Sequence, residues 1–99
     1  MGEDGHTASL FPGHALLNET KALIAPISDS PKPPPQRVTF TFPLLQAAKH
    51  LAFAATGAGK QDPMRWIFTE TRKGTPAGMV PEKRPDTVFF VDKAATAKL

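Results

Sequence analysis

The residues with the most evident chemistry lie at the start of the chain, in the stretch GEDGHTASLFPG at 2–13. Asp4 and His6 stand two positions apart, beside Gly2 and Gly5. An imidazole is a general base near neutral pH, and a neighbouring carboxylate can orient its ring. The spacing therefore predicts an Asp–His pair that activates a nucleophile, in a loop whose glycines let the backbone approach a ligand.

Two other interpretations of Asp4 and His6 stay open at this point. The pair could bind a metal ion, but two ligands are too few, and His14 and His50 stand at no spacing typical of a metal site. Alternatively both residues are structural, because Asp-Gly is a common turn and a surface histidine commonly makes a hydrogen bond.

Lys60 and Arg37 are the cationic candidates for binding an anionic ligand. Lys60 ends the sequence TGAGK at 56–60, which follows an apolar run and is typical of a strand-to-helix turn. Backbone N–H groups at such a turn can hold an anion, and the lysine would add positive charge. The loop lacks the spacing and the Ser or Thr of nucleotide-hydrolase loops. Either cation could instead be an ordinary solvent-exposed side chain.

Apolar runs and turn-forming residues predict an α/β fold, part of an open, mostly parallel sheet flanked by helices. We expect strands at 21–27, 38–42, 51–55 and 87–91, and helices at 43–50, 61–71 and 93–99. Asp62 and Asp92 are expected to cap two of these helices. The remaining expectations are a helical turn at 7–11, a stiff proline connector at 31–35 and a loop without assigned role at 72–86.

Composition narrows the class of protein. The 99 residues contain no cysteine, which removes disulfides, thiolate nucleophiles and Cys-ligated metals. The net charge of +3 comes from cations spread along the chain, which does not favour a nucleic-acid surface. No apolar run approaches the roughly 20 residues that span a bilayer, and no signal peptide is visible. We therefore expect a cytoplasmic protein without nucleic-acid or membrane partners.

Four stretches together resemble the 6-phosphogluconolactonase family, within the glucosamine-6-phosphate isomerase/6-phosphogluconolactonase superfamily. They are GEDGHTASLFPG, SDSPKPPPQRVTFTFPLLQAAKH, ATGAGK and TVFFVDKAATAKL. The resemblance implies a Rossmann-like sheet and hydrolysis of 6-phospho-D-glucono-1,5-lactone to 6-phosphogluconate in the pentose phosphate pathway, without metal or cofactor. Related deaminases carry Asn-Glu-Pro after the histidine segment, whereas this chain has Ser9-Leu10-Phe11-Pro12. Lactonase is therefore favoured over deaminase.

The same resemblance implies roles for the candidate residues. His6 would activate the attacking water, and Asp4 would orient His6 or a sugar hydroxyl. Arg37 and Lys60 would contact the phosphate of the sugar-phosphate lactone, and Gly5 would let that substrate approach the backbone.

Members of this family are more than twice as long. We therefore expect residues 1–99 to be the C-terminal part of a single domain whose N-terminal half is missing. Alone, such a chain is expected to expose apolar surface, to be marginally stable and to have little activity. The alternatives are a non-catalytic fragment, a proline-rich segment at 29–37 that docks in an aromatic groove, or an isomerase or deaminase relative. The sequence predicts no oligomeric state.

Overall fold

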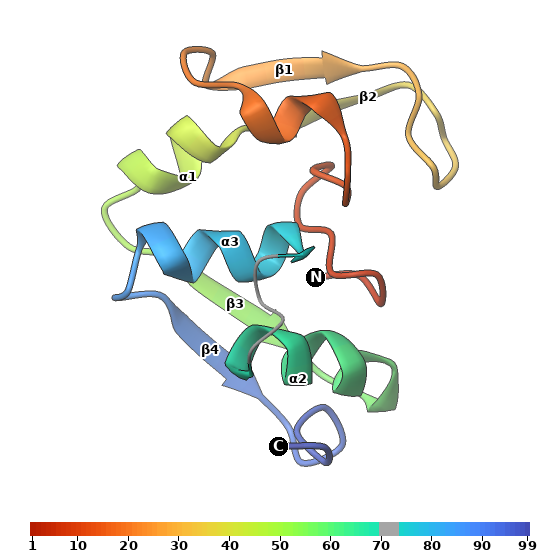
Figure 1. The fold of residues 1–99 in the computed structure, drawn as a ribbon, viewed down its shortest axis with the longest axis vertical. Helices are drawn as coiled ribbons and strands as arrows, with labels where there is room; N and C mark the ends of the chain where they lie inside the picture. The colour runs from red at the N-terminus through yellow and green to blue at the C-terminus, as the bar shows by residue number, and fades with distance from the viewer. Residues whose placement is uncertain (70–73) are drawn as a thin grey trace.

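The computed structural model describes residues 1–69 and 74–99. Within these residues it contains four strands, three α-helices and two short 3₁₀ helices (Figure 1). In chain order they are η1 (Ala15–Asn18), β1 (Ile24–Ile27), β2 (Arg37–Phe40), α1 (Phe42–Ala47), β3 (Ala52–Ala55), η2 (Ala58–Lys60), α2 (Gln61–Phe68), α3 (Pro76–Lys83) and β4 (Val88–Val91). None of the helices in this part of the chain is long and apolar enough to cross a bilayer.

The strands form two separate pairs. β3 and β4 are parallel, with Ala52 opposite Val88, and helices connect them, so the predicted α/β class and its parallel pairing are confirmed. β2 instead pairs antiparallel with β1, and Ile24 lies opposite Phe40. The alternation of strands and helices along the sequence predicted that β2 would lie parallel to its neighbour in the sheet. That prediction was wrong. Only the nine-residue proline segment joins β1 to β2, too short for the crossover that parallel strands need.

A helix occupies most of the segment expected to be the loop at 72–86. α3 begins after Thr75, whose hydroxyl accepts a hydrogen bond from the Gly78 N–H, and Pro76 stands in its first turn. A capping threonine followed by proline is a helix-start signal. The Gly and Pro content of the segment concealed it. The first two residues of that expected loop, and the end of the helix expected at 61–71, lie outside the described residues.

Two shorter expectations also differ from the structure. Residues 7–11 form a narrow turn, with mutual backbone hydrogen bonds between Thr7 and Leu10, because Ala8 has a left-handed φ of 50°. Residues 93–98 form successive turns instead of a helix. Asp92 still caps the first of them, accepting a hydrogen bond from the Ala95 N–H at 2.8 Å.

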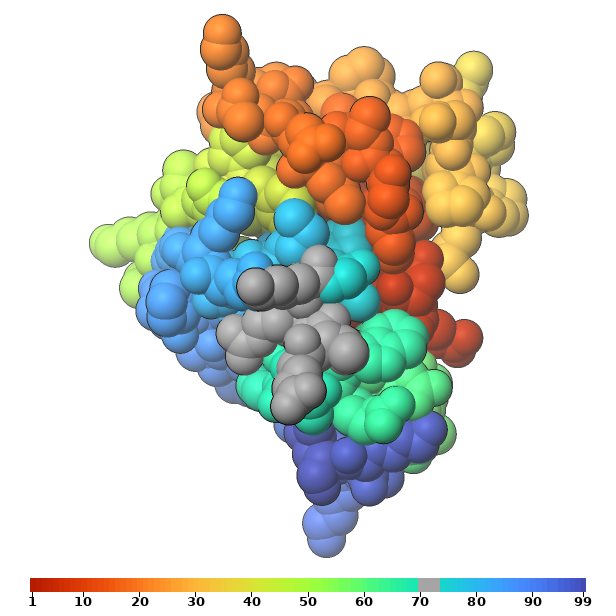
Figure 2. Space-filling model, in the orientation of Figure 1, coloured from red at the N-terminus to blue at the C-terminus, as the bar shows by residue number. Residues whose placement is uncertain are grey.

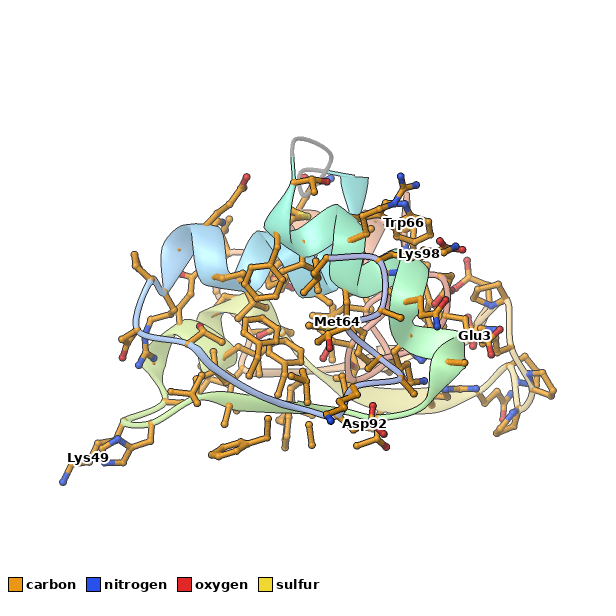
Figure 3. All side chains as sticks on the ribbon, turned by 90° about the horizontal axis from the view of Figure 1, so that it is seen from below. Glu3, Lys49, Met64, Trp66, Asp92 and Lys98 are labelled. Carbon is orange, nitrogen blue, oxygen red and sulfur yellow. The ribbon has the colours of Figure 1, made fainter. Side chains whose placement is uncertain are left out.

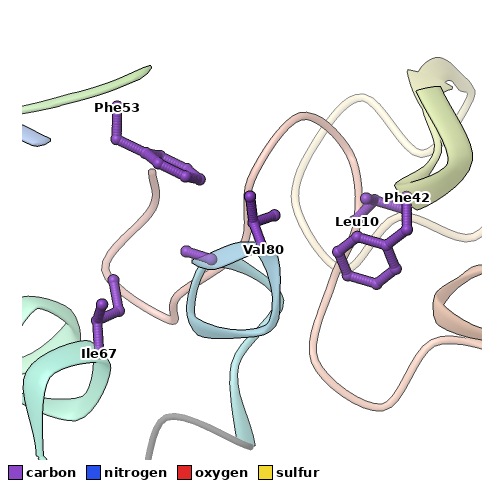
Figure 4. Packing of buried hydrophobic residues seen from close by; sticks show 6 residues of the cluster. Leu10, Phe42, Phe53, Ile67 and Val80 are labelled. Carbon is purple, nitrogen blue, oxygen red and sulfur yellow. The ribbon is translucent and has the colours of Figure 1, made fainter. Parts of the chain in front are cut away.

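The main core surrounds α3. Figure 4 shows Val80 of this helix between Phe53 and Ile67 on one side and Leu10 and Phe42 on the other. Leu10 is fully buried, so the N-terminal stretch is anchored in the core a few residues after the candidate catalytic pair. The packing of α3 therefore determines where that pair lies.

The outer faces of both strand pairs are apolar and exposed. On β2, Val38 is 72% exposed and Phe40 is 51% exposed. On β4, Val88 and Phe90 are 50% and 64% exposed. Alternate residues of a strand share a face, so each pair presents a continuous apolar surface to solvent. The expectation that the chain exposes apolar sheet surface is confirmed.

Candidate active site

Asp4 and His6 form a hydrogen-bonded pair. One oxygen of Asp4, Oδ1, lies 2.6 Å from His6 Nδ1 and 3.1 Å from the His6 backbone nitrogen. The side chains are 33% and 19% exposed, respectively. An ionised carboxylate only accepts hydrogen bonds, so the ring donates through Nδ1 and the lone pair of the neutral imidazole is at Nε2. This is the arrangement that the spacing predicted.

The surroundings of Asp4 keep its carboxyl group ionised. Burial raises the pKa of Asp4, but the hydrogen bonds from the His6 backbone and ring outweigh it. The charge of the His6 ring, when it is protonated, and the charge of Lys32 act in the same direction, so the pKa of Asp4 is below its ordinary value. Asp4 therefore remains an acceptor for His6 at neutral pH.

Gly5 determines the shape of the loop between the two residues. Its φ is +84°, and a Cβ added to it would lie 2.7 Å from the Thr75 Cβ. The Gly5 N–H donates to the Gly2 carbonyl, and the Gly5 carbonyl accepts from the Ala77 N–H in the first turn of α3. Both backbone groups thus make internal hydrogen bonds. The contact of Gly5 with substrate stays a prediction, while its role in docking the loop on α3 is visible.

Phe11 brings Arg37 and His6 together. Its buried ring lies 4.7 Å from the His6 ring, centroid to centroid, and the Arg37 guanidinium carbon lies 5.4 Å from the same ring. Nothing in the sequence singled out Phe11, because an aromatic in an apolar context is ordinarily a core residue. Only the fold reveals this contact.

Arg37 also holds the proline segment at 29–37. Its guanidinium donates to three backbone carbonyls of that segment and, at 3.4 Å, to Ser9 Oγ in the N-terminal stretch. These bonds favour the interpretation of the prolines as a fixed connector over a freely docking ligand. They also fix the backbone of Lys32, a residue with no role predicted from the sequence, whose charge is one of the causes that lower the pKa of Asp4.

Lys60 lies at the other flank of the N-terminal stretch. A Cβ on Gly59 would meet Glu3 Oε1 at 2.7 Å, so the η2 turn contacts this stretch directly. Burial, and then the charge of Lys60, lower the pKa of the Met1 ammonium. Figure 2 shows the N-terminal segment between the proline segment and the beginning of α2.

The backbone of the turn before Lys60 differs from the expected anion cradle. The Gly57 N–H, which the sequence offered to an anion, is 3.1 Å from both carboxylate oxygens of Asp92. That N–H is therefore not available to an anion, and the role of Lys60 in binding one stays a prediction. Asp92 follows β4, so a contact between two strand ends fixes the turn.

A cavity of about 330 Å³ adjoins Asp4, and His6 is not among the residues that line it. Its lining residues are Asp4, Pro12, Trp66, Gly74 and Thr75. Figure 3 shows Trp66 on the same side of the molecule as Glu3, with Lys49 at the far end. Among the described residues, no group of three His, Cys, Asp or Glu side chains is placed to hold a metal ion.

Comparisons with known proteins agree with the motifs. The sequence pattern of a family described as glucosamine-6-phosphate isomerases/6-phosphogluconolactonase matches residues 1–89. The chain is 50% identical over 99 residues to 6-phosphogluconolactonase of Rattus norvegicus, and 48% identical to a chloroplastic 6-phosphogluconolactonase of Arabidopsis thaliana. A solved 6-phosphogluconolactonase from Trypanosoma brucei superposes on the whole chain with a TM-score of 0.81 at 31% identity.

The matched proteins are considerably longer. The matches cover the whole of this chain but only 38% of the rat protein, 30% of the Arabidopsis protein and 40% of the trypanosomal one. The site described here is therefore the portion that these 99 residues contribute.

Proposed function

Because the chain belongs to the glucosamine-6-phosphate isomerase/6-phosphogluconolactonase family, we propose that it carries the general base and part of the phosphate site of a 6-phosphogluconolactonase. The reaction is hydrolysis of 6-phospho-D-glucono-1,5-lactone to 6-phosphogluconate, in the pentose phosphate pathway. The observation that carries the proposal is the 2.6 Å contact between Asp4 and His6 Nδ1, which leaves Nε2 as a base.

His6 acts on water. Nε2 takes a proton as the water oxygen bonds to the lactone carbonyl carbon, and the carbonyl oxygen becomes an oxyanion. When that tetrahedral intermediate collapses, the bond from the carbonyl carbon to the ring oxygen breaks. The imidazolium returns its proton to the departing ring oxygen, which becomes a hydroxyl. Asp4 holds the ring, and the negative charge of its ionised carboxylate stabilises the imidazolium.

Positive charge on both flanks of the N-terminal stretch suits a phosphorylated substrate. Lys60 lies beside residues 1–3, and Arg37 packs on the Phe11 ring that also contacts His6. Gly5 would let the sugar approach the loop. A phosphate dianion at one end of the sugar needs cations in this region, either in direct contact with it or fixing the groups that contact it, and these cations orient the carbonyl toward the base.

One feature favours hydrolysis over an isomerase or deaminase reaction. An apolar ring, Phe11, packs against His6, and the imidazole hydrogen-bonds to a single carboxylate, that of Asp4. Proton transfer between neighbouring sugar carbons and loss of an amine call for further acid–base groups beside the histidine. A water-activating base needs only the pair.

We further propose that residues 1–99 form the C-terminal part of one domain and have little activity alone. The exposed faces of β1–β2 and β3–β4, together with the relatives' greater length, support this. The cytoplasmic location stays a prediction, since several relatives are named chloroplastic.

The experiment compares the chain alone with the same chain joined to the preceding segment of the rat relative, by lactone hydrolysis. The joined protein should turn over, and the chain alone should not. In the joined protein, His6→Ala should reduce kcat/KM by about 10²-fold or more, the range for loss of a general base. His14→Ala is the matched control, because His14 also pairs with a carboxylate, Asp29 at 2.8 Å.

The control should keep its rate within about threefold, as expected for a histidine outside the chemistry. A His6→Ala protein that retained its rate would remove the general-base assignment. Full turnover by the 99-residue chain would overturn its proposed inactivity while leaving the reaction intact.

A further inference from the structure

Arg37 has little hydrogen-bonding capacity left for a ligand. Nη2 donates to the carbonyls of Lys32 and Pro33 at 2.9 Å each, and Nε donates to the Pro34 carbonyl at 3.0 Å. A guanidinium binds phosphate best through two neighbouring N–H groups on one edge. Both of its paired edges include Nη2, whose two hydrogens are used here. Arg37 would have to release the proline segment before it could grip a phosphate in this way.

The same bonds fix the backbone of Lys32. Its carbonyl accepts hydrogen bonds from Arg37 Nη2 and, at 2.7 Å, from Ser30 Oγ. Its N–H donates to the same hydroxyl at 3.2 Å. The backbone is therefore held on both sides while the residue remains solvent-exposed. A fixed Cα with an exposed ammonium is well arranged to bind an incoming anion.

Lys32 also lies toward the catalytic pair. Arg37, to which its carbonyl is bonded, packs on the Phe11 ring, and that ring contacts His6. The charge of Lys32 contributes to the low pKa of Asp4, which places its ammonium in the same electrostatic neighbourhood. The backbone of Lys32 is thus linked to the pair through Arg37 and Phe11, and its side chain extends from a segment that Arg37 holds in place.

We propose, resting on the function proposed above, that Lys32 binds the phosphate of the substrate and that Arg37 is a positioning residue that fixes the Lys32 segment. An ammonium on a flexible stem binds phosphate as a point charge and needs no paired edge. Lys60 supplies charge from the other flank. The phosphate is then held between two lysines, and the Arg37 guanidinium stays on Phe11.

The test uses the joined protein described above and two ligands that differ only in the phosphate, 6-phosphogluconate and gluconate. Reductive ¹³C-methylation keeps the lysine charges and gives each ammonium an NMR signal. The Lys32 and Lys60 signals should shift with 6-phosphogluconate and not with gluconate. Lys32→Met should raise the Kd for 6-phosphogluconate about tenfold, as expected for loss of a charge-assisted hydrogen bond. Lys49→Met, the same charge change at the far end of the molecule, should leave it within twofold.

Arg37→Lys separates positioning from direct contact. This variant keeps the charge but cannot bond three carbonyls, so the backbone amide signals of Ser30 and Lys32 should shift before any ligand is added, and affinity should fall. One combination of results would overturn the inference and make Arg37 the phosphate contact. In it, the Kd of Lys32→Met stays within twofold of the parent's, and Arg37→Lys loses binding while the Ser30 and Lys32 amide signals do not shift. If Lys60 responds and Lys32 does not, the inference also falls and the proposed function stands. If the unsubstituted joined protein responds to neither ligand, the inference and the proposed function both fall.

Discussion

Gly5→Ala is expected to unfold the catalytic loop from α3, because two separate constraints act at this position. The residue has a φ of +84°, and a left-handed conformation costs an alanine about 1 kcal/mol. A new Cβ would also lie 2.7 Å from both Cβ and Cγ2 of Thr75. Those atoms belong to a buried threonine, so the loop or the helix start must move.

The magnitude follows from what that movement breaks. Displacing Thr75 weakens the cap of α3, which contributes about 1 kcal/mol. Moving Gly5 weakens the hydrogen bond from Ala77 to its carbonyl, at about 1 kcal/mol. With the backbone cost, Gly5→Ala should lower the free energy of unfolding by about 3 kcal/mol, from the sum of these typical values.

Gly13→Ala provides the control. Gly13 has a similar φ of +74°, but an added Cβ would meet no atom within 4 Å. Gly13→Ala should lower the free energy of unfolding only by the cost of the left-handed backbone, about 1 kcal/mol. Any effect of alanine on the unfolded chain is common to both variants and cancels in the comparison. The difference of about 2 kcal/mol corresponds to roughly 10 °C in Tm for a chain of this size.

The assay is thermal or urea unfolding followed by the fluorescence of Trp66, the one tryptophan in the sequence, which lines the cavity with Asp4 and Thr75. Equal midpoints for the two alanine variants would refute the reasoning, because the contact with Thr75 would then contribute nothing. A larger loss for Gly13→Ala would refute it as well.

Three further outcomes are expected. Arg84→Met should lower the urea midpoint more than Asp86→Asn does, because Arg84 bonds both to Asp86 and to the carbonyls that end α1; equal effects would show that those carbonyls do not matter. The folded pKa of Asp4 is depressed, so its stabilising contribution is present above the unfolded pKa and is lost as pH falls through the folded value; the stability difference between the parent and Asp4→Asn, measured by unfolding from pH 6 downward, should therefore shrink in acid. Phe90→Thr should reduce aggregation of the 99-residue chain in light scattering without lowering its Tm, whereas a clear loss of Tm would mean that the exposed β4 face is packed in solution.

Local sequence patterns located most of the fold. The apolar runs around Ala52–Ala55 and Val88–Val91 identified two strands, and their parallel pairing followed from the intervening helical segment. The runs also predicted strands covered on both faces, which was wrong for this chain, since Val88 and Phe90 are exposed. The Asp4–His6 pair was predicted from two-residue spacing, because such a contact needs only local geometry. Proline at 43 correctly marked the start of α1.

The failures concern contacts between distant segments and one helix of unusual composition. α3 contains Gly78 and Pro81, residues of low helix propensity, and it is stabilised by its cap and by burial of Val80 in the core. The contact between Phe11 and Arg37 joins segments more than 20 residues apart. The bonds that fix Lys32 depend on a turn whose shape no residue propensity encodes.

The residues after β4 extend the functional unit beyond the matched family pattern, which stops at residue 89. Asp92 binds the turn before Lys60, the Ala94 carbonyl accepts from the Gln61 side chain, and Ala95 is completely buried. A protein shortened to residue 89 would keep the first three of the motif stretches named above and lose the contacts that hold the turn before Lys60. Designed variants and reporter fusions should therefore retain the tail through Leu99 and attach beyond it.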